Sequence, residues 1–273
     1  MTDLLVRSAG LTKRYGTTAV LDQVDLEVPE GSVYGLVGPN GAGKTTLLSI
    51  LAGLRTLSSG AVHIAVDLSE VAVCPDAPEF EPWLTAAEVL ALSASLAHRS
   101  LQPEAIQALL VQAGLGEAAA RRVGGFSRGM TQRLALAATL AGDPKLIILD
   151  EPCSALDPAG RVEVLDLITR LAARATVIFS SHILADVQRV CTSVGVLRQG
   201  RLLLPGRAAG AAGRARGTPL DRPHPRAGGG GDRFARRRGM GEGGDRPRWR
   251  QAADRGGQPG RGRGAPRRGT RPG

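Results

Sequence analysis

Long apolar stretches are missing from this chain of 273 residues. No run reaches the roughly 18 apolar residues that a membrane-spanning helix needs. The opening, MTDLLVRSAG, lacks the apolar core of a secretory signal peptide. Any role at a membrane is therefore expected to depend on a partner protein.

Cysteine is scarce as well. Cys74, Cys153 and Cys191 are odd in number and widely spaced, and they do not show the spacing of a zinc site or a redox pair. We therefore expect reduced thiols and a cytosolic chain. Internal repeats are also lacking, which argues against a repeat architecture.

Lysine is absent from the end of the chain. Residues 205–273 hold 18 Arg and 5 acidic residues, a net charge of +13, which leaves 17 basic and 20 acidic residues and a net charge of −3 for residues 1–204. The end is rich in Gly and Pro and has no apolar periodicity, so we expect a folded domain at 1–204 and a disordered tail at 205–273. Our hypothesis is that this tail is read out of frame from GC-rich codons. The alternative is a basic tail that binds anionic lipid or nucleic acid weakly.

The first 204 residues alternate apolar runs with helical patterns. Short apolar runs between polar turns predict buried strands, and apolar residues three and four apart predict helices. The expected strands are 33–37, 146–149, 175–179 and a hairpin of 194–197 and 202–204; the expected helices are 44–54, 84–96, 103–113 and one that begins after Ser127. This alternation indicates an α/β fold with a largely parallel sheet, and residues 84–142 form a helical insertion in it.

A glycine-rich loop follows the first of these strands. Residues 38–45 read GPNGAGKT, which matches the phosphate-binding pattern G-x-x-x-x-G-K-[ST] between a strand and a helix. The glycines let the backbone turn its N–H groups inward, and the N-terminus of the helix adds a partial positive charge. Lys44 is expected to contact the β- and γ-phosphates, and the Thr45 hydroxyl to bind Mg²⁺. A glycine-rich turn with a chance Lys-Thr pair is the alternative.

An acidic pair, Asp150 and Glu151, follows the apolar run at 146–149. A carboxylate at the C-terminal end of a strand can hold Mg²⁺ through its water shell, and a second one can polarise an attacking water. Such a pair alone is a weak signal, because loops after strands are usually polar. In one sheet with the glycine-rich loop, it predicts a partner of that loop in nucleotide hydrolysis.

Four further stretches distinguish among the proteins that share such a loop. They are KRYG with Tyr15, FSRGM at 126–130, SALD at 154–157, and the pair Ser181-His182. Together with GPNGAGKTT, and in this order over about residues 4–204, they resemble the ATP-binding subunits of ABC transporters. A P-loop kinase or GTPase has no use for FSRGM and SALD.

The resemblance implies a P-loop NTPase cassette with a RecA-like core, a mostly parallel sheet, an N-terminal antiparallel β part and an inserted helical subdomain. It implies ATP and Mg²⁺ as cofactors. Tyr15 would stack on the adenine, Glu151 would be the catalytic base, and His182 would contact the γ-phosphate. The residues implied to hold the phosphates are Gly38, Pro39, Asn40, Gly41, Ala42, Gly43, Lys44, Thr45 and Thr46, and those implied for the metal are Thr45, Asp150 and Asp76.

The same resemblance places Ser127 and Gly129 in a signature loop that faces the ATP of the opposite subunit, and it adds Asp157 to the nucleotide contacts. Ser127 also caps a helix whose N-terminus can offer N–H groups to an anion. ATP would then lie between two subunits of a homodimer or heterodimer, packed head to tail. Taken alone, Ser127 is only a helix cap, Tyr15 is a surface or edge residue, and His182 is a satisfied core or surface histidine.

Two positions depart from the family pattern. The usual LSGGQ is FSRGM here, and the stretch S-R-G-M-x-Q-R-L resembles the branch associated with ABC-2 type exporters. The usual Gln ahead of the helical insertion is replaced by Asp76, a shorter acid that can still reach Mg²⁺ through water.

We therefore expect an ATPase subunit that powers transport, with export preferred, through a separate integral-membrane permease. It would lie at the cytoplasmic face of the membrane as a peripheral protein, and no specific nucleic acid partner is expected. The alternative is a soluble ABC-type ATPase that acts on nucleic acid or ribosomes through the basic tail. Tandem cassettes or long heptad insertions are typical of such proteins, whereas this chain has one cassette and 83 residues between Gly43 and Ser127.

Overall fold

Two β-sheets form the frame of the computed structural model, which describes residues 3–154 and 156–207. An antiparallel sheet has the order β2-β1-β4, and a six-stranded sheet has the order β5-β6-β7-β3-β8-β9. The strands are β1 (Leu4–Tyr15), β2 (Thr18–Pro29), β3 (Val33–Val37), β4 (Ser59–Ile64), β5 (Val71–Cys74), β6 (Leu146–Leu149), β7 (Thr176–Ser181), β8 (Ser193–Arg198) and β9 (Arg201–Arg207). Apart from the backbone of β9, the tail predicted at 205–273 lies outside the described residues.

The six-stranded sheet is parallel except at one edge. Strands β3, β5, β6, β7 and β8 pair in parallel, and β9 pairs with β8 antiparallel. The predicted α/β fold with a largely parallel sheet and a terminal hairpin is therefore confirmed. The antiparallel part implied by the family resemblance is the sheet of β1, β2 and β4.

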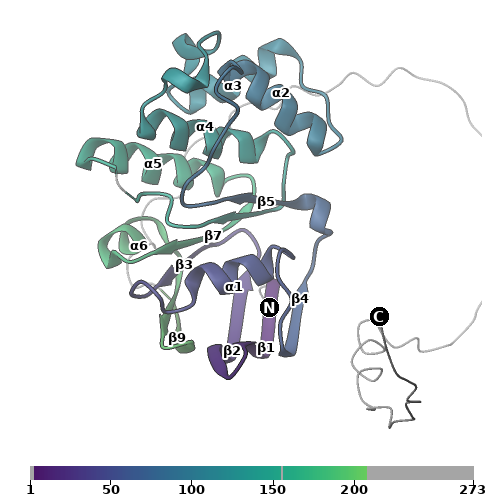
Figure 1. Ribbon diagram of the computed structural model, residues 1–273, viewed down its shortest axis with the longest axis vertical. Coiled ribbons are helices and arrows are strands. Elements are labelled where there is room, and N and C mark those ends of the chain that lie inside the picture. Colours follow the sequence, from purple (N-terminus) through teal and green to yellow (C-terminus); the bar gives the residue numbers. More distant parts are fainter. Residues whose placement is uncertain (1–2, 155, 208–273) are drawn as a thin grey trace, which may run out of the picture. The chain divides into compact units, whose positions relative to one another are not determined.

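Helix α1 (Lys44–Leu51) lies between the two sheets (Figure 1). Its side chains Leu47 and Leu51 are fully buried in one apolar cluster with residues of β1, β2, β3 and β6. In β6, Leu146 and Ile148 face this cluster, while Ile147 and Leu149 face a second one on the other side of the sheet. Burial on both faces explains why β6 is a continuous apolar run.

The second cluster joins the sheet to the remaining helices, which are α2 (Ala86–Leu96), α3 (Pro103–Gln112), α4 (Arg128–Leu140), α5 (Pro158–Leu171) and α6 (Leu184–Val190). Helices α2, α3 and α4 form the helical insertion, which lies beyond β5 in Figure 1. Helix α4 contacts α2, α3, α5 and β5, so it connects the insertion to the rest of the fold. These three helices fall within residues 84–142, the range predicted for the insertion.

Local hydrogen bonds determine where two of the predicted helices begin or end. Helix α1 stops at Leu51, three residues before the predicted end, because Gly53 turns into the left-handed conformation at φ +71° and the N–H of Leu54 donates to the carbonyl of Ser49. Helix α2 begins at Ala86, because Thr85 caps it: the Glu88 N–H donates to the Thr85 hydroxyl, and the Thr85 N–H donates to the Glu88 carboxylate.

The three cysteines, Cys74, Cys153 and Cys191, are buried and free of disulfide bonds. Within residues 3–154 and 156–207, every helix is too short or too polar to cross a membrane.

Replacement of Leu134 by Ala should destabilise the fold, because this fully buried side chain of α4 joins the insertion to the sheet. We expect the free energy of unfolding to fall by about 2–5 kcal/mol, measured by urea denaturation. The control, Leu96→Ala, removes a side chain that is 75% exposed and should change that energy by less than about 0.5 kcal/mol. Equal effects of the two substitutions would contradict this packing.

Candidate functional site

Four parallel strands end at the same edge of the six-stranded sheet, and the predicted site residues lie there. The phosphate loop follows β3, Asp76 follows β5, the acidic pair follows β6, and His182 follows β7. A cleft of about 400 Å³ opens at this edge. It is lined by Val20, Asn40, Gly41, Gly43, Lys44, Thr45, Thr46, Asp76, Asp150 and Glu151.

The phosphate loop presents free backbone donors at the start of α1. The N–H groups of Gly43, Lys44, Thr45 and Thr46 donate to no other residue in the described ranges. Gly43 has φ +104°, and a Cβ atom there would lie 2.9 Å from the Val20 carbonyl oxygen, so only glycine fits. Unpaired backbone donors at the positive end of a helix are features that suit an anion such as phosphate.

Lys44 is buried at the centre of the cleft. Its ammonium group donates to the carbonyl oxygens of Gly38 at 2.7 Å and Pro39 at 3.2 Å, and it lies 3.1 Å from Glu151 Oε1. The other carboxylate oxygen, Glu151 Oε2, lies 2.8 Å from His182 Nδ1. The three residues that the sequence predicts as catalytic are therefore joined in one chain of contacts.

Asp150 and Glu151 share one supporting side chain, Ser180 in β7. The Ser180 hydroxyl donates to Asp150 Oδ1 at 2.7 Å and accepts the Glu151 N–H at 2.8 Å. Sequence reasoning did not single out Ser180, although the pair of serines before His182 was visible. Its role becomes apparent only when β7 is known to lie beside β6, with Leu149 opposite Phe179.

Asp76 also faces this cleft, and its carboxylate accepts a hydrogen bond from the Ser154 hydroxyl. The pKa of the neighbouring Cys74 thiol depends on burial and on nearby carboxylates. Burial and then the negative charges of Asp150 and Asp76 raise the pKa of Cys74 to about 12. Two carboxylates make a negative charge on a nearby thiol unfavourable, and for the same reason they favour a cation beside them.

The cleft fits a nucleotide with its metal. The free N–H groups and Lys44 suit an anionic phosphate chain, while the Thr45 hydroxyl and the carboxylates of Asp150 and Asp76 are the oxygen donors that Mg²⁺ prefers. Of the predicted phosphate residues, Gly38 and Ala42 are buried; the Gly38 N–H donates to the Ser181 carbonyl, and the Ala42 carbonyl accepts the Gly200 N–H.

Tyr15 lies at the end of β1, outside the lining of the cleft. Its ring is 45% exposed, its hydroxyl accepts a hydrogen bond from Arg55, and the Lys13 ammonium lies 5.0 Å from the ring centre. Val20 in β2 lines the cleft itself, and sequence reasoning missed it. A single valine in a strand that alternates apolar and polar residues gives no sequence signal of a binding role. Only the turn between β1 and β2 brings it to the phosphate loop.

The predicted signature residues lie in a second cleft, of about 370 Å³. Ser127 caps α4 by accepting the Met130 N–H at 3.3 Å, as predicted, and Asp157 caps α5 by accepting the Gly160 N–H at 3.1 Å. Both residues and Gly129 line this second cleft and are absent from the lining of the phosphate cleft. These three residues are therefore placed together, apart from the phosphate loop of their own chain.

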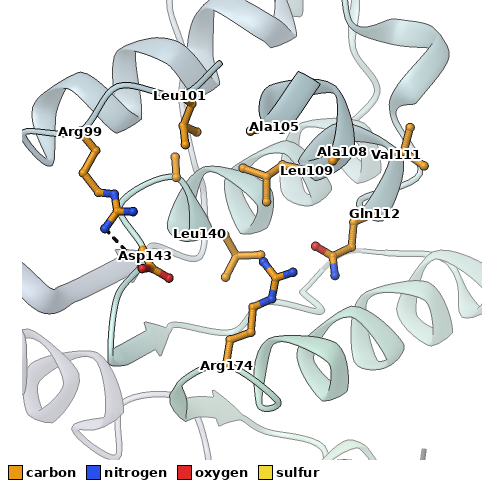
Figure 2. A pocket seen from close by; sticks show the side chains of 11 residues that line it. Arg99, Leu101, Ala105, Ala108, Leu109, Val111, Gln112, Leu140, Asp143 and Arg174 are labelled. Atoms are coloured by element: carbon orange, nitrogen blue, oxygen red, sulfur yellow. Dashed lines mark hydrogen bonds and ion pairs between the residues drawn. The ribbon is translucent and has the colours of Figure 1, made fainter. Parts of the chain in front are cut away.

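A third cavity, of about 550 Å³, lies among α3, the end of α4 and the turn before β7 (Figure 2). Its lining combines apolar residues with the charged side chains of Arg99, Asp143 and Arg174. Arg99 donates to Asp143 at 3.3 Å, and the Arg174 side chain points toward Leu140 and Gln112. The apolar lining residues are Leu101, Ala105, Ala108, Leu109, Val111, Leu140 and Ala141.

Comparisons with known proteins agree with this geometry. The ABC transporter family matches residues 21–154. The uncharacterized ABC transporter ATP-binding protein YxlF of Bacillus subtilis is 42% identical over 70% of this chain and 67% of its own. The lantibiotic transport ATP-binding protein SrtF of Streptococcus pyogenes is 34% identical over 73% and 90%, and the bacitracin transport ATP-binding protein BcrA of Bacillus licheniformis is 36% identical over 73% and 68%.

Solved structures are similar over the same region. The ATP-binding subunit of an ABC transporter superimposes with a TM-score of 0.67 at 30% identity, over 74% of this chain and 90% of that one. A dimeric ATP-binding cassette in a post-hydrolysis state, bound to ADP and Pi, has a TM-score of 0.66 at 25% identity, over 75% and 99%. With its phosphate loop, acidic pair and helical insertion, this chain belongs to the ATP-binding proteins of ABC transporters, and it is an ATP-hydrolysing transport subunit.

Proposed function

We propose that the cleft at the edge of the sheet binds ATP with Mg²⁺ and that Glu151 activates the water that attacks the γ-phosphate. The observation that carries this proposal is the contact chain from Lys44 through Glu151 to His182, beside the free N–H groups of α1. Lys44 and the loop from Gly38 to Thr46 hold the phosphates, and His182 orients Glu151 and contacts the γ-phosphate. Tyr15, with its exposed ring, stacks on the adenine.

Thr45, Asp150 and Asp76 are the proposed metal ligands, directly or through water. When bound, Mg²⁺ neutralises charge on the phosphates and orients them. This chain's own contribution is to aim these carboxylates at the cleft. The Ser154 contact and the Ser180 hydrogen bond serve that purpose for Asp76 and Asp150.

The second cleft, which holds the predicted signature residues, completes the ATP site of another subunit. Ser127, Gly129 and Asp157 line a cleft that the phosphate loop of the same chain does not reach. Similarity to a solved dimer of ATP-binding cassettes supports a homodimer or heterodimer with ATP between the subunits. Closure of such a dimer on ATP couples hydrolysis to movement.

A membrane permease is the proposed partner, and the cavity in Figure 2 is its proposed docking site. The cavity is lined mostly by apolar residues, and its Arg174 makes no ion pair with another described residue, so an apolar helix end with an acidic side chain would fit it. This subunit would then lie as a peripheral protein at the cytoplasmic face of the membrane. Export is the proposed direction, because S-R-G-M-x-Q-R-L resembles the exporter branch; the relatives named for lantibiotic and bacitracin transport support it.

Replacement of Lys44 by Ala should abolish tight ATP binding, because the buried ammonium group is the main positive charge of the cleft. We expect the affinity for a fluorescent ATP analogue to fall at least about tenfold, in line with the loss of a charge-assisted contact. The control is Lys145→Ala, which removes an exposed lysine that pairs with Glu70. Unchanged ATP affinity in the Lys44 variant would remove the phosphate-site assignment.

The variant Glu151→Gln should bind ATP but hydrolyse it about 10²- to 10⁴-fold more slowly, because the amide cannot act as a base. It should also accumulate as an ATP-bound dimer on size-exclusion chromatography. Glu104→Gln changes an exposed glutamate of α3 in the same way and should retain the wild-type rate. Hydrolysis at the wild-type rate by the Glu151 variant would show that another group is the base.

A charged, bulky side chain in the docking cavity should weaken membrane association without changing the ATPase. Ala108→Arg fills the cavity from α3, whereas Ala91→Arg adds the same side chain to an exposed site of α2 outside it. In cells that also produce the membrane protein encoded by the adjacent gene, Ala108→Arg should shift the subunit from the membrane fraction to the supernatant. Equal fractionation of both variants would refute this docking site.

A further inference from the structure

Ser180 occupies the last but one position of β7 and is fully buried. The parallel pairing of β7 with β6 sets Phe179 opposite Leu149, so Ser180 lies beside Asp150. A serine at this depth is shielded from bulk solvent, so its hydroxyl is expected to find hydrogen-bond partners within the protein.

Both partners belong to the acidic pair. The hydroxyl donates its only proton to Asp150 Oδ1 and uses a lone pair to accept the Glu151 N–H. Within the described ranges, no other residue bonds the Asp150 carboxylate or the Glu151 N–H. One hydroxyl therefore determines the orientation of one carboxylate and the backbone position of the other residue.

The backbone at Glu151 needs such support. Glu151 has φ +45°, a left-handed conformation that is unfavourable for a residue other than glycine. This conformation turns the chain after β6 so that the Glu151 side chain reaches Lys44 and His182. A strained conformation persists only where surrounding contacts maintain it.

We propose that Ser180 is a positioning residue for ATP hydrolysis, which aligns Asp150 toward the metal and Glu151 toward the attacking water. The inference rests on the proposed roles of these two acids. Because Ser180 occupies Oδ1, the other oxygen of Asp150 is left for the metal or its water. The same hydroxyl keeps the Glu151 carboxylate at the γ-phosphate end of the cleft.

A neighbouring hydroxyl of the same strand provides a matched control. Thr176 is also buried in β7, and its hydroxyl accepts the backbone N–H of Gly31, at the end of the strand away from the cleft. Thr176→Val removes that bond and keeps the volume, so it costs stability without touching the acidic pair. Ser180→Ala removes the bonds to both acids, and Ser180→Thr retains the hydroxyl.

The test uses the full chain and compares ATPase kinetics, nucleotide binding and thermal unfolding. For Ser180→Ala we expect kcat to fall about 10- to 100-fold, the effect typical of a lost supporting hydrogen bond. The Mg²⁺ concentration for half-maximal rate should rise, while the affinity for fluorescent ADP in EDTA should stay within about twofold, because the phosphate loop is unchanged. Ser180→Thr should recover most of kcat, and Thr176→Val should keep wild-type kinetics despite a lower melting temperature.

Three outcomes would overturn the proposal. They are wild-type kcat and Mg²⁺ dependence in Ser180→Ala, no recovery in a folded Ser180→Thr, and a loss of kcat in Thr176→Val as large as that in Ser180→Ala.

If Ser180→Ala does not fold, Ser180→Cys provides a fallback, because its thiol makes weaker hydrogen bonds. It should show the same rise in Mg²⁺ requirement, and the absence of that rise would refute the inference. A wild-type chain without Mg²⁺-dependent hydrolysis would instead refute the proposed function, so the two failures are distinguishable.

Discussion

Parallel pairing of β5, β6, β7 and β3 is the constraint on which the site depends, because it brings four strand ends to one edge. Each strand is short and apolar, and none could be stable alone. Their pairing is maintained by two clusters of buried side chains, one on each face of the sheet. The polar residues after each strand are thereby brought within reach of one another, and ion pairs and hydrogen bonds such as Lys44–Glu151 and His182–Glu151 then join them. Packing of apolar residues far from the cleft thus determines the geometry of the charged groups.

Much of this arrangement could be predicted from the sequence. The loop GPNGAGKT, the acidic pair after LIIL and the capping Ser127 carry local signals, and each lies where the pattern indicated. Helix α1 was predicted too long, because the left-handed turn at Gly53 was not recognised. The domain boundary at 204 and the tail remain predictions, since residues 208–273 lie outside the described ranges.

Contacts between strands could not be predicted in the same way. Ser180 and Val20 take part in the site only through the order of strands and the turn between β1 and β2, and neither property is encoded within a few residues. The same holds for the separation of Ser127 and Asp157 from the phosphate loop. A motif predicts which groups a site contains, whereas the non-local packing of sheets and helices decides which groups meet.

Lys44 lies 3.1 Å from the carboxylate of Glu151. In the proposed site, a γ-phosphate that approaches Lys44 would compete with this carboxylate for the ammonium group. Such an exchange would separate the proposed base from its counter-ion when the phosphate binds. Phosphate binding and readiness for hydrolysis would then be coupled through a single lysine.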